Sequence, residues 1–336
     1  MLRLLTSLIL AALALPALAG GEVTTERFYI DSPEAGLKLY LLNKHPAAMK
    51  RATPGKVILF VHGATYPSEA AFDVDLPGGS WMDYVAARGY DVYLVDVRGY
   101  GGSSRPPAMD RPPAEGQPFA DTADAVRDVG AAVDFILARR KINSLDLLGW
   151  SWGTAIMAGY SAQNPEKVSK LVLYAPIWII KEDAPVSGSG AYRTLAKDAA
   201  KTRALRGVPA EKIAEVSPEG WSDIWWAAAQ ASDPGGASAA SPVMRAPNGV
   251  VKDLSERWAK GEPTYDPAKI KAPTLLILGE WDREAPLYMS EDLFGKLVNA
   301  HQRRLVVLPE GNHFLLWEKN RLALISQVQA FLDEGR

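Results

Sequence analysis

The pentapeptide Gly149-Trp150-Ser151-Trp152-Gly153 places a serine between two glycines where the expected secondary structure changes. The apolar run 145–148 predicts a buried strand before it, and the segment 154–162 predicts a helix that ends at Asn164-Pro165. A sharp strand-to-helix turn would strain the serine backbone and lift its hydroxyl above the sheet edge, and small flanking residues avoid collisions. The pattern therefore predicts a serine placed to act as a nucleophile.

A serine hydroxyl needs a base to take its proton and an acid to orient that base. His313 follows the apolar run 305–308, which predicts a strand near the C-terminus. Asp282 lies in the loop 280–286, directly after the predicted strand 274–278. Ser151, Asp282 and His313 thus each come just past a predicted strand, and ligands of parallel sheets bind beyond those strand ends.

Two further segments extend this pattern. The predicted strand 57–61 ends in His62-Gly63-Ala64, and the strand 91–95 is followed by Asp-Val-Arg-Gly-Tyr-Gly-Gly-Ser at 96–103. With the serine, aspartate and histidine loops in the same order, the chain resembles the α/β-hydrolases that use a serine nucleophile, over about residues 27 to 332. The resemblance implies an α/β fold with a mostly parallel central sheet, helices on both faces and an inserted helical cap.

The resemblance also implies three catalytic roles: Ser151 as nucleophile, His313 as base and Asp282 as the acid that orients the base. Other carboxylates compete for the role of acid, either in the same loop or after the strand 170–174, where some relatives place it. These alternatives are Glu280, Glu284, Glu182 and Asp183.

An oxyanion hole is expected from the backbone N–H groups of Ala64 and Trp152. Thr65 or Tyr66 could replace Ala64 or add a hydroxyl. Trp150 and Trp152 flank the nucleophile, so at least one of them should line the floor of the site. The sequence thus predicts Trp150, Trp152 and Tyr66 as substrate-binding residues.

Other residues that invite a functional role have a structural interpretation in the same resemblance. His62 corresponds to a buried histidine that bonds loop backbone, and Asp96 and Arg98 correspond to residues that fix their loop. Four scattered histidines and no cysteine offer no metal-ligand spacing, so neither a metal nor another cofactor is expected.

The elements that position these residues alternate along the chain. Two antiparallel strands are expected at 28–30 and 37–42, joined by a segment rich in turn formers. The strands that follow are predicted at 57–61, 91–95, 145–148, 170–174, 274–278 and 304–308. The intervening helices are predicted near 79–88, 121–140, 287–298 and 320–333. Apolar strands that alternate with helices predict a parallel sheet covered on both faces.

The alternation breaks between the strand 170–174 and about residue 269. The segment 176–268 reads as helices and loops rich in aromatic residues, and 232–241 is a small-residue piece expected to be a mobile loop. At this position the resemblance implies a cap over the active site. We therefore divide the chain into a signal peptide (1–19), a core in two parts (20–175 and 269–336) and the cap insert (176–268).

The N-terminus predicts export. Arg3 is followed by an apolar stretch up to Leu15, and Ala17-Leu18-Ala19 fits a cleavage site before Gly20. The expected location is the bacterial periplasm or the exterior, with no stable membrane association after cleavage. An uncleaved anchor is the alternative, although the apolar stretch is short for a membrane span.

Composition narrows the function classes. The chain has 336 residues, 48% of them hydrophobic, with a formal net charge of −2 and no cysteine. It shows no Lys/Arg cluster that would indicate nucleic-acid binding. The triad indicates acyl-transfer hydrolysis, and esters are the least demanding substrates. A carboxylesterase for small to medium, possibly aromatic, soluble esters is therefore expected.

The same three residues also serve other chemistries, so the sequence leaves alternatives open. These are an aminopeptidase, a lactonase, a carbon–carbon bond hydrolase, a hydroxynitrile-lyase-like enzyme and a ligand-binding protein on this scaffold. The natural substrate and the oligomeric state are not given by the sequence.

Overall fold

The computed structural model describes residues 22–181 and 189–335, so the predicted signal peptide lies outside the described residues. Its centre is an eight-stranded sheet with the strand order β1-β2-β4-β3-β5-β6-β9-β10. The strands are β1 (Val23–Asp31), β2 (Lys38–Pro46), β3 (Val57–Val61), β4 (Asp91–Val95), β5 (Leu145–Trp150), β6 (Val168–Tyr174), β9 (Thr274–Gly279) and β10 (Arg303–Leu308). The pairs β1–β2 and β2–β4 are antiparallel, and the remaining pairs are parallel.

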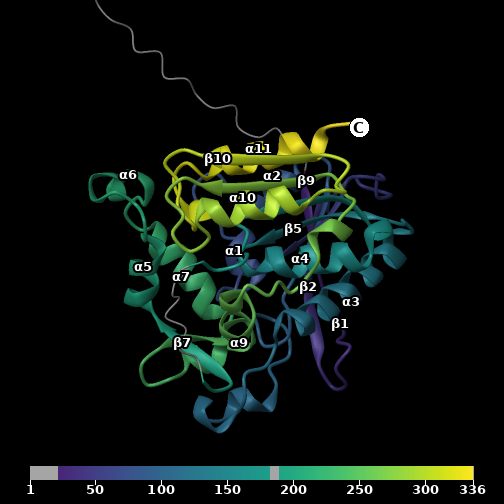
Figure 1. The fold of residues 1–336 in the computed structure, drawn as a ribbon. Helices are drawn as coiled ribbons and strands as arrows, with labels where there is room; N and C mark the ends of the chain where they lie inside the picture. Colours follow the sequence, from purple (N-terminus) through teal and green to yellow (C-terminus); the bar gives the residue numbers. More distant parts are fainter. Residues whose placement is uncertain (1–21, 182–188, 336) are drawn as a thin grey trace, which may run out of the picture.

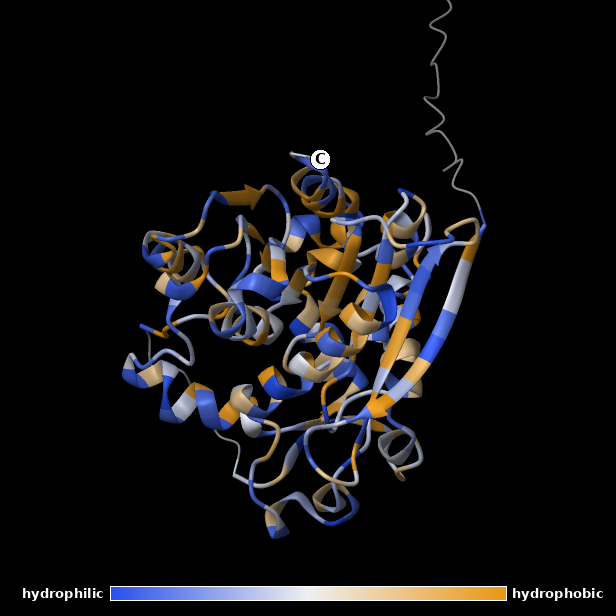
Figure 2. Ribbon diagram, turned by 90° about the vertical axis from the view of Figure 1, so that its right-hand side faces the viewer, coloured by the Kyte–Doolittle hydropathy of each residue, from blue (hydrophilic) through white to orange (hydrophobic). Residues whose placement is uncertain are grey.

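The central strands are buried along their whole length, as expected for a sheet that is covered on both faces. Every residue of β3, β4, β5 and β9 is buried, and hydrophobic residues concentrate on the strands inside the molecule (Figure 2). The edge strand β1 instead alternates between half-buried and exposed residues along most of its length, because only one of its faces packs on the protein.

Helices cover the two faces of the sheet (Figure 1). The apolar residues of α2 (Trp81–Ala86) and α11 (Arg321–Asp333) belong to one hydrophobic cluster. Those of α3 (Thr122–Arg140), α4 (Trp152–Gln163) and α10 (Leu287–Lys296) belong to a second cluster. The prediction of a mostly parallel sheet with helices on both faces is therefore confirmed. A short helix that the sequence did not suggest, α1 (Ser68–Phe72), follows β3.

The described residues of the insert, 176–181 and 189–268, lie beside the sheet, to the left and below it in Figure 1. Its helices are α5 (Lys197–Ala204), α6 (Ile213–Val216), α7 (Trp221–Ala231), α8 (Pro234–Ala237) and α9 (Gly249–Glu256). It also holds two strands, β7 (Tyr192–Ala196) and β8 (Val243–Pro247), which pair antiparallel. The sequence missed these strands because they pair across about fifty residues and carry no clear alternation.

The segment 232–241, which the composition predicts to be a mobile loop, is partly helical in the structure. It contains α8, and Asp233 beside that helix accepts a hydrogen bond of 2.8 Å from the backbone N–H of Arg245 in β8. The Arg245 guanidinium adds an ion pair of 2.7 Å to the same carboxylate. Small residues here therefore permit tight packing against β8, where composition alone suggested a loop.

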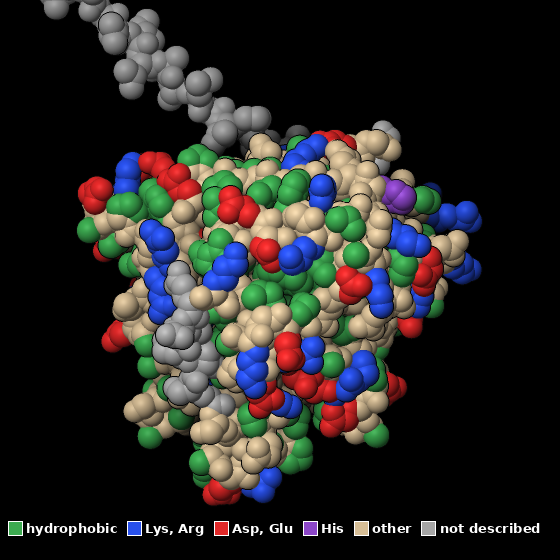
Figure 3. Space-filling model, viewed as in Figure 1, with side chains coloured by type: hydrophobic (Ala, Val, Ile, Leu, Met, Phe, Trp, Pro, Cys, Tyr) green, Lys and Arg blue, Asp and Glu red, His purple; other side chains and the backbone are tan. Residues whose placement is uncertain are grey.

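The surface carries interspersed basic and acidic side chains, as the face in Figure 3 shows. Among the described residues, no helix combines the length and the apolar character that crossing a membrane requires.

Candidate active site

Ser151 occupies the sharp turn between β5 and α4. Its backbone has φ 57° and ψ −121°, a conformation that is costly for a residue with a side chain. A Cβ at Gly149 would lie 2.2 Å from the Gly153 carbonyl oxygen, and one at Gly153 would lie 2.6 Å from the carbonyl oxygens of Val61 and His62. Both positions therefore require glycine. Ser151 stands at the N-cap of α4, but its side chain caps no backbone N–H and stays available.

Three side chains from three loops form one hydrogen-bonded chain. The Ser151 Oγ lies 2.9 Å from Nε2 of His313, and Nδ1 of His313 lies 2.8 Å from Oδ2 of Asp282. All three residues are buried. Because an ionised carboxylate can only accept, Asp282 selects the tautomer of His313 with the proton on Nδ1. The Nε2 lone pair then faces the serine hydroxyl, which is the arrangement of a base and its nucleophile.

The loops after β9 and β10 are fixed to each other, and this fixes Asp282 and His313. The last residues of the two strands, Gly279 and Leu308, are register partners. Beyond them, the Trp281 N–H donates to the Gly311 carbonyl at 2.9 Å. The carboxylate and the imidazole therefore leave neighbouring strands from loops that cannot shift independently.

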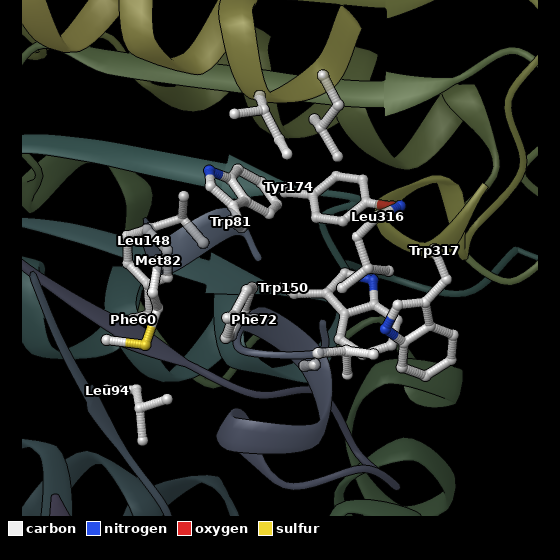
Figure 4. Close-up of a cluster of buried hydrophobic side chains, with 14 of the residues drawn as sticks. Phe60, Phe72, Trp81, Met82, Leu94, Leu148, Trp150, Tyr174, Leu316 and Trp317 are labelled. Carbon is white, nitrogen blue, oxygen red and sulfur yellow. The ribbon is translucent and has the colours of Figure 1, made fainter. Parts of the chain in front are cut away.

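Further hydrogen bonds orient the two groups within these loops. The Oδ1 of Asp282 accepts the backbone N–H groups of Glu284 and Ala285 at 2.9 and 2.7 Å, which leaves Oδ2 for the histidine. The His313 carbonyl accepts the indole N–H of Trp150 at 3.1 Å and the hydroxyl of Tyr174 at 3.0 Å. Trp150 lies between Tyr174 and Trp317 in the aromatic cluster of Figure 4.

The structure separates Asp282 from its competitors. Glu280 accepts the backbone N–H of Glu310 at 3.0 Å on the exposed side of the loop. Glu284 lies 3.8 Å from Nε2 of His313, the nitrogen that faces Ser151, and is therefore not the group that orients Nδ1. Glu182 and Asp183 lie outside the described residues.

The charge around His313 favours its protonated form. Burial lowers the pKa of His313, but the attraction and hydrogen bond of Asp282 outweigh burial and leave the pKa raised above its ordinary value. A carboxylate that stabilises the imidazolium in this way assists a step in which the histidine takes up a proton.

The loop after β3 is rigid around Ala64. Nδ1 of His62 lies 2.7 Å from the Gly63 carbonyl, and Nε2 of His62 accepts the Val97 N–H at 3.2 Å. Burial lowers the pKa of His62 to about 4, so the ring is neutral. The Ala64 carbonyl accepts the hydroxyl of Tyr100 at 2.7 Å and a guanidinium N–H of Arg193. His62 thus holds loop backbone, and the peptides on both sides of Ala64 are fixed.

Asp96 and Arg98 also hold loop structure. Asp96 accepts the backbone N–H groups of Ser68 at 2.7 Å and Gly102 at 3.0 Å. Arg98 makes two hydrogen bonds to Asp128 in α3 through its guanidinium, at 2.8 and 2.6 Å. Neither side chain reaches Ser151.

Trp152 requires a correction to the sequence interpretation. It is the first residue of α4, so its backbone N–H has no acceptor one turn earlier in the helix. Its indole, however, points away from the site: Nε1 donates to Thr122 at 3.0 Å, and the ring packs near His62 and Tyr100. The indoles of Trp150 and Trp152 thus have partners on different sides of Ser151. The Trp152 side chain therefore does not line the cavity, whereas those of Trp150 and Tyr66 do.

The cavity beside Ser151 is small in this structure. Its volume is about 10 Å³, roughly the space of one water molecule. The residues that line it come from three core segments and the insert: Gly63, Ala64, Thr65, Tyr66, Trp150, Ser151, Arg203, His313 and Phe314. An acyl group is larger than this volume, so we expect lining side chains of the core or of the insert to move when a substrate reaches the serine.

An aromatic layer forms much of the cover. Trp225 of α7 stacks on Trp317 with ring centroids 4.6 Å apart, and both rings contact Tyr66. None of the α7 tryptophans lines the cavity itself. Trp225 packs behind the lining residue Tyr66, and the Arg321 guanidinium lies over the ring of Trp221.

Three residues of the site were not identified from the sequence. Phe314 follows the histidine directly, so its place could have been expected. Arg193 and Arg203 come from the insert, and nothing in their sequence surroundings indicates that they converge on the loop after β3. Among the described residues, no group of three potential His, Asp or Glu ligands could hold a metal ion.

Comparisons with known proteins agree with the fold. A family model described as alpha/beta hydrolase fold matches residues 56–320. A putative non-heme chloroperoxidase from Synechocystis sp. is 25% identical over 280 residues, which cover 78% of this chain and 86% of that protein.

Solved structures with the same fold include a serine hydrolase and an esterase. A serine hydrolase from the polyaromatic-hydrocarbon-degrading bacterium Cycloclasticus zankles has a TM-score of 0.62 and 16% identity, covering 92% of this chain and 98% of that one. An esterase from Thermogutta terrifontis has a TM-score of 0.60 and 16% identity, covering 91% and 98%. At such identities the likeness concerns the fold.

Proposed function

Because this chain belongs to the alpha/beta hydrolase fold family, we propose that it is a serine hydrolase that cleaves carboxylic esters through an acyl-enzyme. The hydrogen-bonded chain from Ser151 through His313 to Asp282 carries the proposal, since its distances of 2.9 and 2.8 Å suit proton transfer. The strained turn that presents Ser151 supports the same assignment.

In the proposed reaction, Nε2 of His313 takes the proton of Ser151 while Oγ attacks the ester carbonyl. Asp282 stabilises the imidazolium that forms. The imidazolium then gives its proton to the leaving alcohol, and the acyl group stays on Ser151. A water molecule, deprotonated by His313, attacks the acyl-enzyme and releases the carboxylic acid.

The negative charge on the carbonyl oxygen needs donors that are already in place. We assign these to the backbone N–H groups of Ala64 and Trp152. Fixed peptides around Ala64 and the free first N–H of α4 support this assignment. Each such donor typically contributes about 3–4 kcal/mol to barrier reduction.

The competing activities have less support. An aminopeptidase needs a carboxylate for the ammonium group of its substrate. Of the candidates, Glu182 and Asp183 lie outside the described residues, Glu219 is exposed, and Glu284 is paired with Arg203. A pure binding protein has no use for the buried Ser151–His313 pair. Lactones, carbon–carbon bonds and thioesters remain as outcomes of a substrate panel, since they need the same triad.

The proposed substrates are small to medium soluble esters, aryl esters included. The cover of Tyr66, Trp225 and Trp317 offers rigid aromatic surface that suits flat or bulky groups. We expect p-nitrophenyl acetate and short aryl esters to be cleaved faster than long-chain triglyceride emulsions, lactones or aminoacyl anilides. A panel of these substrates tests the proposal, and faster cleavage of the emulsions would refute the size argument.

A matched pair of variants tests the role of the aromatic cover. Trp225→Ala removes a ring that packs on Tyr66, so we expect KM for bulky aryl esters to rise about threefold to tenfold. The KM for acetate esters should change little. Trp221→Ala is the control, because Trp221 lies over Arg321 and away from Tyr66. Equal effects of both variants on all esters would contradict this role.

Export is proposed from the N-terminal pattern. When the full chain is expressed in a bacterium, we expect N-terminal mass spectrometry to find Gly20 as the first residue, because small residues precede it. In the control Ala19→Arg, cleavage should fail. A membrane-bound product that still begins at Met1 or Leu2 would support an uncleaved anchor instead.

A further inference from the structure

One guanidinium from the insert connects three parts of the site. Arg203 in α5 donates from Nε and Nη2 to the two carboxylate oxygens of Glu284, at 2.7 and 2.5 Å. Its remaining nitrogen, Nη1, donates to the Thr65 hydroxyl at 2.9 Å. The pair is largely buried, since the Glu284 side chain is 10% exposed and that of Arg203 is 28% exposed. Water therefore screens this interaction little.

Glu284 is a second carboxylate beside the base. Its Oε2 lies 3.8 Å from Nε2 of His313, the nitrogen that must accept the Ser151 proton. Burial would raise the pKa of Glu284, but Arg203 and then His313 lower it to about 2, so Glu284 is ionised near neutral pH. Without a balancing charge, this carboxylate would favour the imidazolium and so remove the base.

Other ionisable groups packed against His313 or its loop are Asp282, Tyr174 and Glu318. Burial raises the pKa of Tyr174 well above its ordinary value and that of Glu318 to about 8, so both are largely neutral near pH 7. Asp282 is the orienting group at Nδ1.

A second arginine of the insert is also near this carboxylate, but it is a weak partner. Arg206 lies 3.9 Å from Glu284 and its side chain is 60% exposed. The charge that can balance Glu284 in the buried site is therefore that of Arg203.

We propose that Arg203 is a positioning residue that neutralises Glu284 and thereby preserves a larger unprotonated fraction of the His313 imidazole for its work as a base. The inference rests on the proposed function. It gives the insert a part in the reaction besides covering the site, because the insert supplies the charge on which the base depends. A purely structural clamp between α5 and the acid loop would leave the protonation of His313 unchanged.

The test is the pH dependence of kcat/KM for p-nitrophenyl acetate, whose acid limb reports the protonation of the free base. In Arg203→Met, Glu284 loses its partner, and we expect the acid limb to move to higher pH by about one unit. At pH values below the acid limb, a shift of about one unit lowers kcat/KM by about tenfold. In Glu284→Gln the limb should move to lower pH. The double variant should return close to wild type, because both charges are gone.

Two further variants separate charge from structure. Arg203→Lys keeps the charge, so its limb should stay near that of wild type. Thr65→Val removes the third contact of Arg203 and no charge, so it should lower the rate by the same factor at every pH. If Arg203→Met and Glu284→Gln lower the rate without moving the limb, the inference is overturned.

The outcomes also separate this inference from the proposed function. If the wild-type protein neither turns over esters nor reacts with a fluorophosphonate, the proposed function fails and the inference fails with it. If the wild type is active but the limb is unmoved in the variants, only the inference fails. If Arg203→Met does not fold, the other two variants still test the inference. The acid limb should move to lower pH in Glu284→Gln and should stay in place in Arg203→Lys.

Discussion

Ser151→Ala is expected to lower kcat for p-nitrophenyl acetate by on the order of a million-fold, to the level that binding and oxyanion donors alone can support. The change removes the only atom that can form the acyl-enzyme in the proposed reaction, while Ala fits the space that the serine side chain occupies. Steady-state kinetics at neutral pH measure the effect, and circular dichroism checks that the fold is retained.

Ser161→Ala provides a matched control for this loss. Ser161 is also a buried serine and lies in the same helix, α4, but not in the loops that form the site. Its variant should keep activity within a few-fold of wild type. Substantial turnover by Ser151→Ala, or an equal loss in Ser161→Ala, would remove Ser151 from its proposed role.

Asp282→Asn is expected to lower kcat by on the order of 10⁴-fold while leaving the fold intact. The reason lies in the donors around the carboxylate. Two backbone N–H groups, of Glu284 and Ala285, bind Oδ1 and would hold the amide oxygen of asparagine in the same place. The amide NH₂ then faces His313 Nδ1, which must accept a hydrogen bond from it. The imidazole proton moves to Nε2, where it faces Ser151 and blocks the base.

The competing carboxylates serve as controls for Asp282. Glu280→Gln changes a group on the exposed side of the loop and should leave kcat close to wild type. Near-normal activity of Asp282→Asn, together with a large loss in Glu182→Gln or Asp183→Asn, would move the acid to the segment after β6. Both assays use the same ester and the same pH.

The core of the fold could be predicted because its signals are local. Buried parallel strands are continuous apolar runs, and those at 57–61 and 91–95 were predicted with the bounds that the structure has. The strand before Ser151 proved longer than expected, since Gly149 and Trp150 still belong to β5. Strand ends are less certain because the turn residues can extend the pairing.

The loops of the site could be predicted for a similar reason. A serine, an aspartate and a histidine each follow a parallel strand, so the sheet brings them to one edge. The direction in which a side chain points next to a sharp turn could not be predicted from the sequence. Trp150 and Trp152 are two residues apart around a strained serine, and the structure places the indoles on different faces of it.

The insert could not be predicted to the same depth, because its contacts join residues that are distant in the chain. β7 and β8 pair across about fifty residues, and Arg203 binds Glu284, which lies 81 residues further along the chain. No local pattern marks Arg203 as a partner of the acid loop. The cover of the site, and the charge that we propose it supplies, emerge only from the three-dimensional arrangement.

The most direct test of the central proposal is covalent labelling of the folded wild-type protein with a fluorophosphonate probe, followed by peptide mass spectrometry. The probe reacts with a serine only where a base and an oxyanion hole activate it. The proposal predicts one labelled peptide, modified at Ser151, with labelling and esterase activity lost in parallel. A label on another serine, or full activity after Ser151 has been modified, would contradict it.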